Sequence, residues 1–165
     1  MAELKIVPME ERHLDALAEL ERVCFSSPWT RGGLAAELQN PCAVFFVAER
    51  DGAVAGYAGM NCVLDECYVD NVAVFPRYRR AGVARALLDR LTDEAEARGA
   101  SFVSLEARVS NTGAVALYEG LGFREAGRRP GFYSNPKEDA LILTKFLKRA
   151  CGETAARPNE GGQPK

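Results

Sequence analysis

Metal-ligating residues are scarce in this sequence. It contains a single histidine, His13, and five cysteines at scattered positions, none of them in a C-x-x-C pair. Zinc sites are usually built from Cys and His ligands at close, regular spacing, so we expect no bound metal. The odd number of cysteines and the lack of a signal-peptide pattern indicate free thiols in a reducing cytoplasm. His13 itself is expected on an exposed helix face.

Long apolar runs and an excess of positive charge are also missing. No apolar run approaches the roughly 20 residues that a membrane-spanning helix needs, so we expect no membrane contact. The net charge of -2 provides no overall positive field that would attract nucleic acid. The arginines gather in two short segments, Arg77–Arg85 and Arg124–Arg129. This local clustering indicates a small anionic ligand rather than a polyanion.

The composition that remains is typical of one globular domain. The chain has 165 residues, of which 47% are hydrophobic and 27% charged. We expect the domain, taken to be a monomer, to span residues 1–149. Residues 150–165 contain almost no large apolar side chain, and we expect them to form a flexible tail because they cannot offset the entropy of ordering.

The spacing of apolar residues predicts alternating strands and helices. Strands are expected over 4–7, 43–49, 54–63, 67–74, 102–107, 123–127 and 140–146, and helices over 14–24, 29–38, 82–97 and 111–121. Asp51-Gly52 between the second and third strands is a strong hairpin signal. This order predicts an α+β, or mixed α/β, fold with one mostly antiparallel mixed sheet and helices on both faces.

A short segment between a strand and a helix has the features of a phosphate site. It consists of Arg79, Arg80, Ala81, Gly82, Val83, Ala84 and Arg85. The first backbone N–H groups of a helix have no intrahelical partner, and the helix dipole adds positive charge there. Gly82 and Ala84 would let a diphosphate approach the backbone. On its own, the segment is equally consistent with an ordinary strand-to-helix connection on a basic surface.

A second motif lies about thirty residues further on. It reads Asn111-x-x-Ala114-x-x-Leu117-Tyr118-x-x-Leu121-Gly122-Phe123. Taken alone, its apolar positions share one helical face and are typical of a packed core, with Asn111 as the helix N-cap and Gly122 as the C-terminal stop. A phosphate-loop NTPase is disfavoured because the chain has no G-x-x-x-x-G-K-[ST] motif.

Together, the two motifs and the strand between them resemble the GNAT family of N-acetyltransferases. Arg79, Gly82 and Ala84 match the family's R/Q-x-x-G-x-G/A signature. The resemblance implies a single GNAT domain that binds acetyl-CoA as cosubstrate. The diphosphate would bind at Arg79–Arg85, the backbone of Val72, Ala73 and Val74 would also contact the cosubstrate, and Asn111 would lie near its pantetheine or acetyl group.

Four further segments resemble the bacterial RimI branch of that family. They are Glu21-x-x-Cys24-Phe25-x-x-Pro28-Trp29, Asn71-Val72-Ala73-Val74-x-Pro76, Leu105-Glu106-Ala107-Arg108-x-Ser110-Asn111 and Glu138–Leu143. This resemblance implies acetylation of the N-terminal alanine of a small-subunit ribosomal protein in the cytoplasm. RimI proteins typically carry an arginine followed by two tyrosines where this chain has Arg129-Pro130-Gly131-Phe132-Tyr133, a departure that bears on peptide preference.

The resemblance also implies catalytic roles. Glu106 would accept the proton of the incoming amine, and Tyr118 would donate a proton to the departing thiolate. A backbone N–H among Val72, Ala73 and Val74 would stabilise the oxyanion. From the residues alone, the favoured interpretation of Glu106 is a salt bridge with Arg108 or another arginine. The alternative functions are acetylation of a lysine or small amine, and a non-catalytic acetyl-CoA-binding module.

Three other side chains have two open interpretations. Glu66 and Asp70 flank one strand and could form an acidic rim that attracts a cationic substrate terminus, or simply a solvated strand edge. Trp29 could form one wall of a peptide groove or anchor the core.

Overall fold

The computed structural model describes residues 3–147. In chain order its elements are β1 (Leu4–Pro8), η1 (Glu11–His13), α1 (Leu14–Cys24), α2 (Arg31–Glu37), β2 (Ala43–Arg50), β3 (Ala53–Val63), β4 (Glu66–Val74), η2 (Pro76–Tyr78), α3 (Val83–Ala97), β5 (Phe102–Arg108), α4 (Thr112–Gly120), β6 (Arg124–Tyr133) and β7 (Glu138–Phe146). The predicted order of strands and helices is therefore confirmed. The predicted boundary between domain and tail, at residues 149 and 150, lies outside the described residues.

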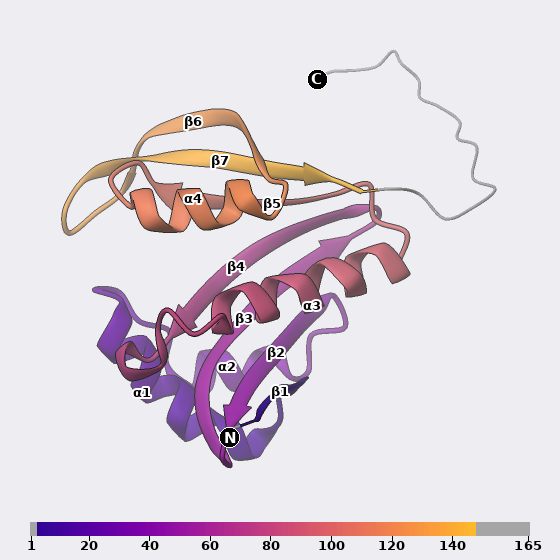
Figure 1. Cartoon of the computed structure of the whole chain (residues 1–165), viewed down its shortest axis with the longest axis vertical. Coiled ribbons are helices and arrows are strands. Elements are labelled where there is room, and N and C mark those ends of the chain that lie inside the picture. The colour runs from indigo at the N-terminus through magenta and orange to yellow at the C-terminus, as the bar shows by residue number, and fades with distance from the viewer. Residues whose placement is uncertain (1–2, 148–165) are drawn as a thin grey trace.

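The strands form one seven-stranded sheet in the order β1-β2-β3-β4-β5-β7-β6. Only the β4–β5 pair is parallel, which confirms the mostly antiparallel mixed sheet. β4 and β5 pair only where Glu66–Tyr68 meets Phe102–Ser104. Beyond that point the two strands separate, and the sheet opens into two wings (Figure 1). Backbone groups on the facing edges of β4 and β5 are therefore left without a strand partner.

Helices cover both faces of the sheet because β2 is apolar on both sides. Phe45 and Val47 pack with α1 in one core cluster, whereas Val44 and Phe46 pack with α3 in the other. Such alternation follows from the two-residue period of a strand. In Figure 1, α3 crosses in front of β2, β3 and β4, with α1 and α2 behind them. α4 packs on the same side of the sheet as α3, since Ala114 packs against the core cluster that contains the buried residues of α3.

The ring of Phe45 is fitted into the sheet opposite a glycine. Phe45 and Gly59 are cross-strand partners, and a Cβ on Gly59 would lie 2.1 Å from the Phe45 ring. Only glycine leaves room for this packing. The Phe45 ring lies 6.0 Å from the Trp29 ring and 6.1 Å from the Tyr57 ring, centroid to centroid. This row of rings fixes Trp29 at the end of the α1–α2 loop.

The helix starts differ in a way that matters for function. Thr30 caps α2 by accepting a hydrogen bond from the Gly33 N–H, and Asn111 caps α4 by accepting one from the Ala114 N–H. At α3 the N-cap is Gly82, with φ of 81° and no side-chain cap. The first-turn N–H groups of α3 are therefore left for a ligand.

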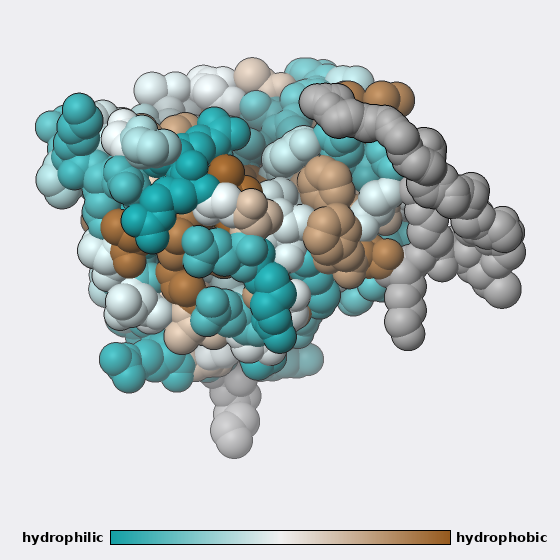
Figure 2. Space-filling model, turned by 90° about the horizontal axis from the view of Figure 1, so that it is seen from above, coloured by the Kyte–Doolittle hydropathy of each residue, from teal (hydrophilic) through white to brown (hydrophobic). Residues whose placement is uncertain are grey.

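β6 is longer than predicted. The expected strand was 123–127, but β6 runs to Tyr133, with irregular register on both sides of Arg129. The Arg-Pro-Gly sequence is a turn signal, yet an edge strand tolerates proline because its outward N–H needs no partner. From the β6–β7 side, Figure 2 shows a mostly hydrophilic surface with apolar residues in small groups. A charged edge of this kind resists pairing with another chain.

The position of His13 also differs from the prediction. It is 1% exposed rather than on a surface face, and its Nε2 lies 2.7 Å from Glu49 Oε2. The four cysteines in the described part of the chain are free, as predicted. Within residues 3–147, no helix is long and apolar enough to cross a membrane, and no group of three His, Cys, Asp or Glu side chains could hold a metal ion.

Candidate active site

A cavity of about 350 Å³ opens at the N-terminus of α3. Its lining residues come from the end of β4, the connecting loop, the first turn of α3 and α4: Val74, Tyr78, Arg79, Arg80, Gly82, Val83, Ala84, Arg85 and Leu117. Arg80 and Gly82 both have positive φ, at 62° and 81°. A Cβ on Gly82 would meet nothing within 4 Å, so the backbone here is open to a ligand. Free N–H groups, the helix dipole and the flanking arginines fit a diphosphate.

Arg79 differs from its two neighbouring arginines in what it contacts. Its Nε donates to the Val74 carbonyl oxygen at 2.9 Å, and its Nη2 lies 3.3 Å from the Cys24 sulfur. Arg79 therefore holds the loop onto β4, in addition to adding charge. Arg80 and Arg85 remain the cations available to an anionic ligand at this cavity.

The backbone of β4 meets the gap at alternate residues. The carbonyl of Val74 faces the gap, since it accepts from Arg79, whereas the next N–H, of Phe75, bonds to β3. Successive peptide groups of a strand point to opposite sides, so Val72 faces the gap with Val74 and Ala73 faces β3. Of the three predicted backbone contacts, the structure brings Val72 and Val74 to the gap.

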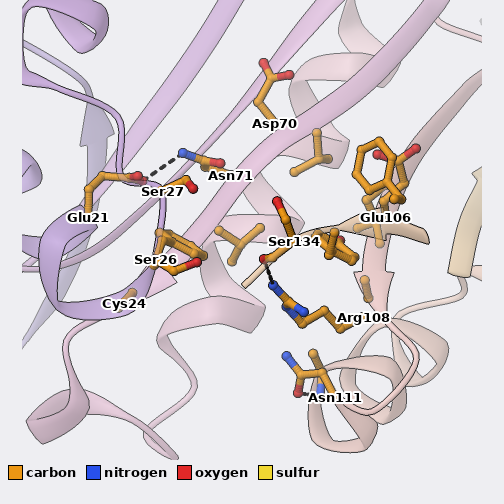
Figure 3. A pocket seen from close by; sticks show the side chains of 18 of the residues that line it. Glu21, Cys24, Ser26, Ser27, Asp70, Asn71, Glu106, Arg108, Asn111 and Ser134 are labelled. Carbon is orange, nitrogen blue, oxygen red and sulfur yellow. Dashed lines mark hydrogen bonds between the residues drawn. The ribbon is translucent and has the colours of Figure 1, made fainter. Parts of the chain in front are cut away.

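A larger cavity, of about 680 Å³, lies between the two wings of the sheet (Figure 3). Its walls come from α1 and the following loop, β4, β5, α4 and the β6–β7 turn. Glu106, Tyr118, Asn111 and Val72, predicted from separate parts of the sequence, all line it. Val74 joins the separate cavity at α3. The predicted catalytic residues therefore share one cavity, and the predicted phosphate residues, except Ala81, share the other.

Glu106 is engaged in an ion pair at this cavity. Its Oε2 lies 2.8 Å from Arg129 Nε, and its side chain is 27% exposed. The predicted salt bridge with an arginine is therefore present, with Arg129 of β6 as the partner. Because only Oε2 is occupied, Oε1 remains available to accept a proton from a group in the cavity. The ion pair and the proton-accepting role are compatible.

Arg108 instead holds the β6–β7 turn. It donates to the carbonyl oxygens of Ser134 and Pro136 at 3.0 and 2.9 Å, and to Glu138 Oε1 at 3.1 Å. Its guanidinium also lies 4.5 Å from the centre of the Tyr133 ring. One arginine thus fixes the turn that forms a wall of the larger cavity.

Tyr118 is both a core residue and a cavity residue. It is 9% exposed, its ring lies 6.1 Å from the Phe123 ring, and it belongs to the α3-side core. Burial, with a smaller contribution from Tyr133, raises the pKa of Tyr118 to about 12. The hydroxyl therefore keeps its proton at neutral pH and can donate it. The packing interpretation and the donor interpretation both fit this position.

The structure also locates the four other residues for which the sequence left two interpretations open. Asn111 is the N-cap of α4 and also lines the larger cavity, so both interpretations of it hold. Trp29 belongs to the core on the α1 side and lines the cavity as well. Asp70 lines the cavity, whereas Glu66 accepts a hydrogen bond from Tyr68 outside the lining. The predicted acidic rim is therefore reduced to Asp70.

The sequence analysis missed a buried carboxylate beside this cavity. Glu21 is 1% exposed and accepts hydrogen bonds from the Tyr57 hydroxyl, the Asn71 amide nitrogen and the Trp29 backbone N–H. Its signal in the sequence was a glutamate on the apolar face of the first predicted helix. A carboxylate at such a position requires buried donors.

Comparison with known proteins is consistent with this geometry. Residues 14–123 match the acetyltransferase (GNAT) family model. The [ribosomal protein bS18]-alanine N-acetyltransferase of Escherichia coli strain K12 is 39% identical over 140 residues, which are 84% of this chain and 94% of that protein.

Solved structures of acetyltransferases are also similar to this chain. The crystal structure of the E. coli ribosomal-protein-S18-alanine N-acetyltransferase has a TM-score of 0.84 and 37% identity, covering 94% of this chain and 100% of that one. The structure of Arabidopsis thaliana NAA60 in complex with acetyl-CoA has a TM-score of 0.79 at 19% identity, covering 88% of this chain and 99% of that one, and shows the shared fold alone.

Proposed function

The chain belongs to the GNAT family of acetyltransferases, which use acetyl-CoA as acetyl donor, and we propose that it acetylates the N-terminal alanine of ribosomal protein bS18. The E. coli relatives named for this activity support the proposal, because the match covers nearly the whole of both chains. The observation that carries the chemistry is the larger cavity, where Glu106 and Tyr118 both line the gap between β4 and β5.

The open backbone at α3 fits acetyl-CoA. Gly82 and the first-turn N–H groups would hold the diphosphate, with Arg80 and Arg85 neutralising its charge. The gap-facing backbone of Val72 and Val74 would bond to the pantetheine arm, in the way a neighbouring strand would. Bound acetyl-CoA supplies an activated thioester, and the protein supplies position and proton transfer.

Glu106 is proposed to accept a proton from the acceptor's ammonium group. An α-amine must be neutral to attack, and its ordinary pKa of roughly 7.7–8.0 makes a modest base sufficient. The Arg129 contact at Oε2 fixes the carboxylate and leaves Oε1 for this proton. Tyr118 is proposed to give its proton to the departing sulfur, because its hydroxyl remains protonated at neutral pH.

The larger cavity is proposed to take the end of the acceptor chain. The α1–α2 loop forms one wall and the β6–β7 turn forms another, and Arg108 holds that turn in place. Because the proposed substrate is a ribosomal protein, we propose that the enzyme acts in the cytoplasm. We further propose that it acts there as a monomer, without binding nucleic acid itself.

A pair of peptides tests the proposed acceptor. One begins with a free alanine and contains an internal lysine, and the other is identical except for a blocked N-terminus. The protein and acetyl-CoA should acetylate only the first peptide. Equal acetylation of both, at lysine, would contradict the proposal and favour a lysine acetyltransferase.

A further inference from the structure

Three hydrogen bonds converge on the buried carboxylate of Glu21. Its Oε1 accepts from the Trp29 backbone N–H at 2.9 Å. Its Oε2 accepts from the Tyr57 hydroxyl at 2.5 Å and from Asn71 Nδ2 at 2.7 Å. The three donors are neutral and come from the α1–α2 loop, β3 and β4, so Glu21 joins three segments around one side of the larger cavity.

This arrangement fixes which way the Asn71 amide is turned. The Trp29 N–H and the Tyr57 hydroxyl both donate to Glu21, so its carboxyl oxygens act as acceptors and the Asn71 amide presents its nitrogen to them. Asn71 Nδ2 also lies 2.9 Å from the Tyr57 oxygen, so both of its hydrogen-bond acceptors are on the Glu21 side of the amide. Burial and the Glu21 carboxylate raise the pKa of Tyr57, so its hydroxyl stays protonated and donates to Glu21.

The amide oxygen of Asn71 therefore faces the opposite way. Asn71 lines the larger cavity on β4, and Figure 3 shows its nitrogen turned to Glu21 and its oxygen on the far side. Among the hydrogen bonds of residues 3–147, none donates to this oxygen. Asn71 thus presents a hydrogen-bond acceptor of fixed orientation to the larger cavity. It lies on β4 beyond the last residue that pairs with β5, and Glu106 lies on β5 across the gap.

We propose that Asn71 is a specificity-determining residue whose Oδ1 accepts a hydrogen bond from an N–H group at the acceptor's N-terminus. Glu21 and Tyr57 are positioning residues, which act on the acceptor through Asn71. This inference rests on the proposed function, since it assumes a peptide acceptor in the cavity. Two N–H sources share this chemistry, the α-amino group and the peptide N–H of the second residue.

Steady-state kinetics with an alanine-led peptide tests the inference. Asn71→Leu removes the acceptor oxygen and should lower kcat/KM for the peptide on the order of tenfold, the effect of one lost hydrogen bond. Glu21→Gln no longer forces the orientation of the Asn71 amide, so this variant should lower kcat/KM for the peptide several-fold. The double variant should be no worse than Asn71→Leu, because Glu21 acts through Asn71. Acetyl-CoA affinity, measured by calorimetry, should stay unchanged in all three.

Asn40→Leu is the matched control. Asn40 donates to Glu37 and Asn61 and accepts from the Cys42 N–H, but it does not line the cavity. The same substitution there should lower the melting temperature and leave peptide kcat/KM unchanged. Should Asn71→Leu fail to fold, Asn71→Ala adds no bulk and carries the same prediction.

A peptide methylated on the second residue's nitrogen separates the two N–H sources. If Asn71 contacts that N–H, methylation lowers kcat/KM for the wild type but not for Asn71→Leu. If Asn71 contacts the α-amine, methylation affects both proteins equally and the loss in Asn71→Leu persists. Either result supports the inference.

The inference would be overturned if Asn71→Leu had the same kcat/KM for the peptide as the wild type. It would also be overturned if the losses of kcat/KM in Glu21→Gln and Asn71→Leu multiplied in the double variant. These outcomes differ from failure of the proposed function. In that case the wild-type protein itself would not acetylate the peptide.

Discussion

Glu106 on β5 and Arg129 on β6 form an ion pair of 2.8 Å at the edge of the larger cavity. Arg129 bonds to one carboxylate oxygen, Oε2, and so fixes the plane of the group. The other oxygen remains available to a substrate. The pair thereby explains how a residue can be held by a salt bridge and still act as a proton acceptor.

Replacing Glu106 with glutamine tests this role. Glutamine keeps the size, and its oxygen can still accept from Arg129, but it takes up no proton in this pH range. We expect kcat to fall most near neutral pH and to recover partly at alkaline pH, where the α-amine is already neutral. Single-turnover rates from pH 6 to 10 measure this. A uniform loss across that range would instead indicate a positioning role.

The Tyr118→Phe variant keeps the ring and its packing against Phe123. Its rate should fall by roughly 10²–10⁴-fold because the departing sulfur loses its proton donor. Since burial raises the pKa of Tyr118 to about 12, the wild-type hydroxyl stays protonated throughout pH 6 to 10. The deficit should therefore be nearly constant over that range, with acetyl-CoA affinity unchanged. Near wild-type rates would show that Tyr118 is only a packing residue.

Two glycines at opposite ends of α3 provide a matched test of the phosphate site. Gly82 and Gly99 have φ of 81° and 79°, and a Cβ at either would meet nothing within 4 Å. Replacing either with leucine should cost about 1–2 kcal/mol of unfolding free energy, from the left-handed backbone. Only Gly82→Leu should weaken acetyl-CoA binding in calorimetry, because its side chain occupies the diphosphate approach. Equal affinities in the two variants would contradict this placement.

Glu138 makes the stability of the β6–β7 turn dependent on pH. Its Oε2 accepts from the Ser110 N–H at 2.6 Å, and its Oε1 accepts from Arg108. These contacts lower the pKa of Glu138 below its ordinary value of 4.5, and the hydrogen bond with Ser110 has the largest effect. The carboxylate therefore stabilises the fold above pH 4.5, and this contribution is lost as the pH falls through the lower folded-state pKa.

Urea unfolding of the wild type and Glu138→Gln should accordingly differ at pH 7. The two should converge as the pH falls from 5 to 3. A difference that is independent of pH would mean that the Glu138 charge makes no contribution.

Much of this fold could be predicted from the sequence because the informative signals are local. The small residues at the start of α3 and the Asn111–Phe123 motif each encode a helix start or a helix face within a few positions. The order of elements then predicted that both helices pack against one sheet. Glu106 and Tyr118 were predicted to share a site because the motifs resemble those of the GNAT family, since local signals alone favoured a salt bridge and core packing.

The remaining features depend on contacts between distant segments. Glu21 meets Tyr57 and Asn71 only after α1 packs on β3 and β4, so no local pattern specifies its partners. Arg129 was missed as the partner of Glu106 because its proline-glycine neighbours resemble a turn, although they lie within an edge strand. In β6, tertiary packing overrides local propensity.

The central claim is tested most directly by locating the acetyl group on the proposed substrate. Unacetylated ribosomal protein bS18 would be incubated with the purified protein and acetyl-CoA, and the modified position read by tandem mass spectrometry. We predict a single acetyl group on the α-amine of the N-terminal alanine, and none with Glu106→Gln over the same short time at neutral pH. Acetylation confined to lysine side chains, or none at all with active cosubstrate binding, would contradict it.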